Sequence, residues 1–81
     1  MTSQLRRAAL SVATNLVEGQ ARKSRGELKQ FTAIALGSLA EVEYLLEFSR
    51  EEGYLTEEGY HTVETFRKRT GALLWNFYEA L

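Results

Sequence analysis

Few side chains in this sequence could carry out catalysis. It has one histidine, His61, no cysteine and no aspartate. No constellation of a nucleophile, a histidine and an acid stands out among the side chains that remain. We therefore expect a non-enzymatic protein that uses no cofactor and no small-molecule substrate.

One pair of residues has the spacing of a metal site. Glu58 and His61 form an E-x-x-H motif, which di-iron helical bundles carry on two helices together with further inward glutamates. This chain has a single histidine, and Glu58 lies where the dipole of a predicted helix explains a negative charge. We expect no metal site, and the alternative is that several chains pool ligands around an oligomer axis.

Basic residues gather in the segment QARKSR and just after it. Phosphate binding grows with the number of cations, and the start of a helix also offers N–H groups to an anion. No aromatic residue interleaves the cluster, which argues against base stacking. A solvated loop or pairing between subunits is the alternative to a nucleic-acid site. The candidates are Arg22, Lys23, Arg25 and Lys29.

Charge is segregated along the chain although the net charge is −1. Residues 1–30 hold six basic and two acidic residues, whereas residues 31–60 hold one basic and seven acidic residues. Segregated charge can steer partners or fix the register between chains, and solvated helix surface is the alternative. The acidic part would repel nucleic acid.

The elements that must position these groups are helices. Eighty-one residues without proline form one domain, 1–81, and the apolar periodicity predicts helices over residues 3–18, 25–52 and 57–80. Short connections make neighbouring helices antiparallel. The fold class is thus all-α, an antiparallel up-down helical bundle.

Local signals mark the helix boundaries. Ser24 followed by Glu27 is a capping-box pattern, and Thr56 can cap the third helix. Gly19 and Gly53 are expected to end the first and second helices.

The second helix is apolar on two sides. One stripe faces the first and third helices, and the other needs cover from elsewhere. Glycine within a helix costs about 1 kcal/mol relative to alanine, a cost that is easier to understand if Gly37 lies under a crossing helix. Packing within the subunit is the alternative. The candidate oligomer interface consists of Ala33, Leu36, Gly37, Ala40 and Tyr44.

The first helix carries a polar stripe opposite its apolar one. Serine, threonine and asparagine are indifferent helix formers, so this face is either solvated or a hydrogen-bonding seam against another helix. Counting back from the loop places the arginines of its first turns level with residues 36–41. The predicted polar seam consists of Arg7, Ser11, Asn15, Glu18 and Glu41.

The third helix is expected to cover the second with one apolar stripe. Its opposite face would hold Glu64 and Lys68 as an i,i+4 ion pair. The stripe comprises Tyr60, Val63, Phe66, Thr70, Leu73, Leu74, Phe77 and Leu81.

Several motifs follow one another in a characteristic order. They are TSQLRRAALS (Thr2 to Ser11), NLVEG (Asn15 to Gly19), RKS (Arg22 to Ser24), Phe31, IALGSLAE (Ile34 to Glu41) and GYL (Gly53 to Leu55). Together they resemble the four-helix-bundle family of rRNA intervening-sequence proteins, encoded in insertions of bacterial large-subunit rRNA genes and elsewhere. The resemblance implies a ring-shaped homopentamer. It also implies a link to accessory proteins of diversity-generating retroelements, which bind a reverse transcriptase and RNA.

Two departures from the family pattern matter. The family has a further amphipathic helix before the TSQ motif, so we expect a fragment, a short form or a start assigned late. That helix or a neighbouring subunit would then cover the second stripe. The chain is also less basic than retroelement accessory proteins, which weakens the RNA expectation.

The most favoured function is a non-enzymatic assembly and interaction module with itself as partner. The alternative is an RNA-binding accessory factor that partners a reverse transcriptase. No apolar run approaches the roughly 18 residues of a membrane span, and no signal peptide is evident. We therefore expect a cytoplasmic location without membrane contact.

Overall fold

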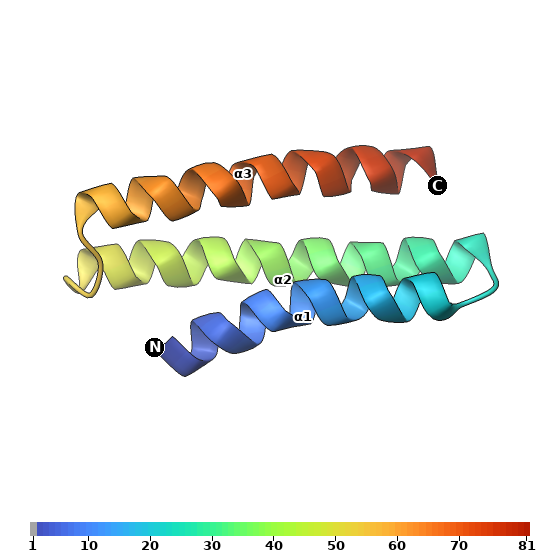
Figure 1. Ribbon diagram of the computed structural model, residues 1–81, viewed down its shortest axis with the longest axis horizontal. Helices are drawn as coiled ribbons and strands as arrows, with labels where there is room; N and C mark the ends of the chain where they lie inside the picture. The colour runs from blue at the N-terminus through green and yellow to red at the C-terminus, as the bar shows by residue number, and fades with distance from the viewer. Residues whose placement is uncertain (1) are drawn as a thin grey trace.

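The computed structural model describes residues 2–81, which fold into three helices and, within that range, no strand: α1 (Thr2–Ala21), α2 (Arg25–Glu51) and α3 (Glu57–Ala80). The helices run up, down and up, as Figure 1 shows. The predicted all-α class and the three helices are confirmed. The chain measures 44 × 22 × 13 Å, so it is a thin array rather than a closed bundle.

The starts of α2 and α3 lie where the capping signals place them. The Ser24 hydroxyl accepts the N–H of Glu27 at 3.2 Å, and the Thr56 hydroxyl accepts the N–H of Gly59 at 3.0 Å. Each bond satisfies one N–H group that a helix start leaves without a partner. Both predicted caps are confirmed.

The end of α2 also agrees with the sequence. Gly53 has a φ of +79°, a left-handed conformation that glycine adopts without strain. Its N–H donates to the carbonyl of Arg50 at 3.1 Å, and the N–H of Tyr54 donates to the carbonyl of Ser49 at 2.8 Å. These two bonds form a Schellman motif.

The predicted end of α1 at Gly19 is wrong, because the helix continues to Ala21. Gly19 is buried against α2 instead. A Cβ atom at Gly19 would lie 2.9 Å from the Cβ of Phe31 and 3.0 Å from a methyl group of Leu28. Here glycine allows two helices to approach closely.

The core lies along α2 in two clusters, both of which include residues from α1 and α3. In each cluster, side chains of α1 and of α3 pack onto the central helix, α2. The first cluster contains Ala8, Val42, Leu45, Leu46 and Tyr60, and the second contains Val12, Ala35, Leu39 and Leu74.

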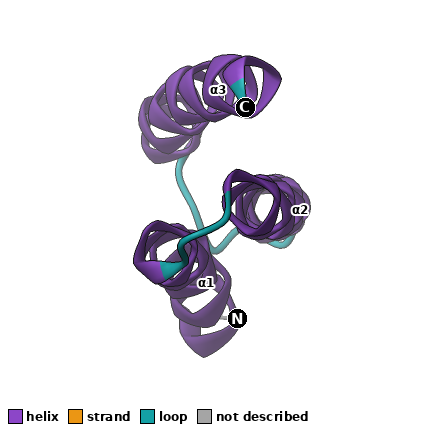
Figure 2. Cartoon of the chain, turned by 90° about the vertical axis from the view of Figure 1, so that its right-hand side faces the viewer, coloured by secondary structure: helices purple, strands orange, loops and turns teal. Residues whose placement is uncertain are grey.

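Both α1 and α3 pack on α2, but in the described chain no Cα atom of α1 lies within 8 Å of a Cα atom of α3. Figure 2 shows them on two different sides of α2. The prediction that the whole apolar stripe of α3 covers α2 is therefore wrong. Tyr60 and Leu74 are buried, as is Glu64. The helix is rotated so that five of its large apolar side chains stay exposed, namely Val63, Phe66, Leu73, Trp75 and Phe77.

Candidate functional site

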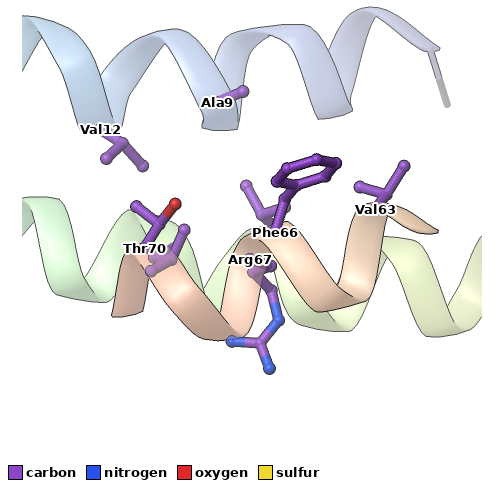
Figure 3. A pocket seen from close by; sticks show the side chains of 8 residues that line it. Ala9, Val12, Val63, Phe66, Arg67 and Thr70 are labelled. Atoms are coloured by element: carbon purple, nitrogen blue, oxygen red, sulfur yellow. The ribbon is translucent and has the colours of Figure 1, made fainter. Parts of the chain in front are cut away.

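An apolar groove runs between α1 and α3, with α2 as its floor. It has a volume of about 230 Å³. Figure 3 shows Val12 pointing from α1 toward α3, and Phe66 and Val63 pointing from α3 toward α1. The residues that line it are Ala9, Val12, Leu39, Val42, Val63, Phe66, Arg67 and Thr70.

The side chains at the groove are unusually exposed for their size. Phe66 is 61% exposed and Val63 is 42% exposed. Burying apolar surface is favourable by about 25 cal/mol per Å², so this surface is suited to a partner. Both side chains belong to the stripe of α3 that was predicted to contact α2.

An ion-pair cluster joins α2 to α3 beside the groove. The Arg67 guanidinium donates to Glu64 in a bidentate arrangement, at 2.6 and 2.9 Å, and to Glu43 of α2 at 2.9 Å. Figure 3 shows that the guanidinium turns away from the groove. The predicted pairing of Glu64 with Lys68 on an exposed face is therefore wrong, because Glu64 is buried and Arg67 takes its carboxylate.

This cluster shifts the ionisation of both partners. The hydrogen bonds from Arg67 lower the pKa of Glu64 below its ordinary value of 4.5, and burial opposes them in part. The hydrogen bonds to Glu64 in turn raise the pKa of Arg67. Such a cluster holds two helices in register, which is a structural role.

The small-residue face of α2 lies on the side away from the groove. Ala33, Gly37, Ala40 and Tyr44 are exposed, and a Cβ at Gly37 would meet no atom within 4 Å. Leu36 differs from them, because it is half-buried and packs against the second core cluster. Four of the five candidate interface residues are thus accessible to a partner.

Part of the predicted polar seam forms a network. The hydroxyls of Ser11 and Ser38 lie 2.8 Å apart, and the Asn15 amide donates to the Ser11 carbonyl at 2.8 Å and to its hydroxyl at 3.1 Å. Ser38 is not among the residues of the predicted seam, since its position opposite Ser11 depends on how α1 and α2 pack. The network fixes the register of these two helices.

The rest of the seam is dispersed. Glu18 pairs with Arg22 at 3.3 Å. Arg7 and Glu41 are exposed, and across residues 2–81 no ion pair joins them. Ala8 packs with Val42 and Leu45, so the first turns of α1 lie level with residues beyond the predicted 36–41.

The basic cluster surrounds the connection between α1 and α2. Arg22 is partly neutralised by Glu18 and by Glu27, which lies 3.9 Å away, and it covers the ring of Phe31. Lys23 and Arg25 are exposed. Over the described range, no carboxylate lies within 4 Å of Lys23, Arg25 or Lys29.

Two aromatic residues of α3 lie close to this cluster. The ammonium of Lys29 is 4.8 Å from the centre of the Tyr78 ring, and Tyr78 stacks on Trp75 with ring centres 5.5 Å apart and planes 24° apart. No aromatic residue interleaves the cluster along the sequence, but in the fold this aromatic pair lies beside it. The antiparallel course of α3 returns its last turns to the start of α2.

The E-x-x-H motif does not assemble a site. His61 is exposed, and its Nε2 atom lies 3.6 Å from a carboxylate oxygen of Glu57. In the part of the chain that the structure describes, no three histidine or acidic side chains come together as metal ligands. Nor does any helix of residues 2–81 have the length and apolar character to cross a membrane.

The family model described as 23S rRNA-intervening sequence protein matches residues 1–76. No curated protein and no solved structure matches the chain.

Proposed function

Since the chain belongs to the family of 23S rRNA-intervening sequence proteins, we propose that it is a non-enzymatic assembly module whose first partner is another copy of itself. The observation that carries this proposal is the open groove between α1 and α3. A three-helix array that leaves such a groove lacks cover for one side of its core.

Two unlike surfaces lie on opposite sides of the same helix. The floor of the groove includes Leu39, whereas Gly37 lies about 200° around α2 from Leu39 at 3.6 residues per turn. One surface is hollow, and the other is covered by small side chains. Contacts between unlike surfaces are head-to-tail, and they close into a ring when the rotation between copies allows it.

A ring of this kind agrees with the homopentamer that family resemblance implies. In the ring, the α2 face around Gly37 of one copy would cover the groove of the next. We place this assembly in the cytoplasm.

Light scattering on the purified chain across a concentration series tests whether the chain associates with itself. We expect a single species of several times the 9.2 kDa chain mass. A monodisperse monomer at high concentration would contradict the proposal.

A second function is favoured by the cations at the connection between α1 and α2. Lys23, Arg25 and Lys29 have no carboxylate partner among residues 2–81. A ring would repeat this cluster in every copy, and affinity for phosphates grows with the number neutralised. We propose that this end contacts nucleic acid, as in an accessory factor that works with a reverse transcriptase.

RNA affinity measured across a series of salt concentrations tests this function. Binding to RNA should weaken steeply between about 50 and 200 mM salt, with a slope that reports the number of phosphates contacted. The Lys23→Gln, Arg25→Gln double variant should reduce both the affinity and the slope. An affinity that is independent of salt would exclude these side chains.

A further inference from the structure

We propose that the end of the molecule formed by the α1–α2 connection and the last turns of α3 binds an unpaired nucleic-acid strand, with Trp75 as the platform on which a base stacks. This inference rests on the second proposed function and names its ligand: a single strand, in contrast to a duplex.

The aromatic pair has the form of a stacking platform. Trp75 and Tyr78 are successive on one side of α3, and their rings are nearly parallel with centres 5.5 Å apart. Trp75 remains 52% exposed although it is large and apolar. Bases stack on exposed aromatic rings in many single-strand-binding proteins, without regard to sequence, because every base has a π face.

Cations lie where the backbone of a stacked strand would need them. Lys29 holds its ammonium over the Tyr78 ring at 4.8 Å, which joins the basic cluster to the aromatic pair. The connection that carries Lys23 and Arg25 lies at the same end as the C-terminus, as Figures 1 and 2 both show. A strand stacked on Trp75 can therefore pass Lys29 and reach the connection, so that one ligand uses both features.

The combination selects unpaired strands. In a duplex the base faces are covered by their neighbours, so Trp75 would gain nothing from it. Cations alone would bind single and double strands through phosphates. The aromatic pair beside the cations thus predicts a preference for single strands over duplexes, which charge alone would not produce.

Trp75 is the only tryptophan in the chain, which makes its fluorescence a direct reporter. We would titrate the full chain at low salt with oligo(dT) and oligo(U) of about 15 nucleotides and with a duplex of the same length. Both single strands should quench Trp75, and the duplex should not. The ratio of the two single-strand affinities distinguishes DNA from RNA as the preferred ligand.

Variants then test the stacking by anisotropy of a labelled oligo(dT). Trp75→Leu should weaken binding roughly 5- to 100-fold, the effect of losing one stacked base, and Trp75→Phe should recover most of the affinity. The matched control is Tyr54→Leu, since Tyr54 is 67% exposed at the opposite end of α2 and should be neutral. Circular dichroism would establish that every variant is helical.

The outcomes separate the two proposals. Equal binding of single and double strands without quenching, or full affinity in Trp75→Leu, would overturn the stacking site and leave phosphate binding in place. No binding of any nucleic acid at low salt would overturn both.

Discussion

Gly19 of α1 and Phe31 of α2 lie so close that a Cβ on the glycine would be 2.9 Å from the Cβ of the phenylalanine. A Cβ atom essentially never comes so close to a carbon atom of a neighbouring side chain. The pair therefore determines how near α1 comes to α2 beside their connection.

Replacement of Gly19 by alanine should destabilise the chain. Alanine is the better helix former by about 1 kcal/mol, but forcing a methyl group into a packed contact costs about 1–3 kcal/mol. Chemical denaturation would measure the difference. Gly26→Ala is the control, because a Cβ there would lie 3.5 Å from the Ser24 hydroxyl, an ordinary contact, and alanine should there stabilise the helix. Equal effects at both positions would show that the close approach is unimportant.

Lowering the pH should destabilise the packing of α3 on α2. The pKa of Glu64 is lowered in the folded chain, so the unfolded chain binds more protons at low pH. The stabilisation is therefore complete above the ordinary value of 4.5 and is lost as pH falls through the lower folded pKa. Glu64→Gln should cost roughly 1–3 kcal/mol at pH 7 and flatten the dependence below pH 4.5.

Denaturation midpoints across a pH series would measure both effects. Arg67→Leu leaves Glu64 buried without its partner, and it should be more harmful at pH 7 than below pH 4.5, where the carboxyl can take up a proton. A Glu64→Gln protein with the acid sensitivity of the parent would contradict the assignment.

A charge placed at the groove should dissociate the assembly. Phe66 lines the groove and is 61% exposed, so Phe66→Glu should leave the helices intact while it removes apolar surface from the proposed interface. The expected result is a smaller mass by light scattering with unchanged helix content. Leu10→Glu is the matched control, since Leu10 is 63% exposed and does not line the groove. A full-sized Phe66→Glu assembly would show that the groove is not covered by a second copy.

The face around Gly37 allows an independent test. A leucine there meets open space within the chain, so Gly37→Leu should lose the oligomer before it loses the helix. Mass and circular dichroism measured along one denaturant series would resolve the order. If the oligomer persists, the contact uses another face of α2.

The sequence predicts those helix boundaries that depend on interactions within a few residues. Ser24, Thr56 and Gly53 act within one turn of their own helix ends, and all three lie where their residue types place them. The exception is Gly19, which resembles a helix end because a turn and a close contact between helices both require glycine. The packing partner Phe31 is 12 positions away, beyond the range of a local signal.

The candidate sites depend on the rotation and course of whole helices. Periodicity identifies the apolar stripe of α3 but does not specify whether Phe66 faces α2 or the space beside it. The hydrogen bond from Arg67 to Glu43 of α2 holds that rotation, and two residues 24 positions apart give no local signal in the sequence. Trp75 joins the basic cluster only because α3 folds back along α2.

The separation of the α1 and α3 backbones has a consequence for motion. The described chain consists of two hairpins that share the helix α2, and no Cα atom of α1 lies within 8 Å of one of α3, so each hairpin is held mainly by its own packing on α2. Cooperative units of this kind unfold separately, each with its own free energy. Helix α3 can therefore leave and return while α1 and α2 stay paired, and an assembling neighbour would meet a chain whose third helix is exchangeable.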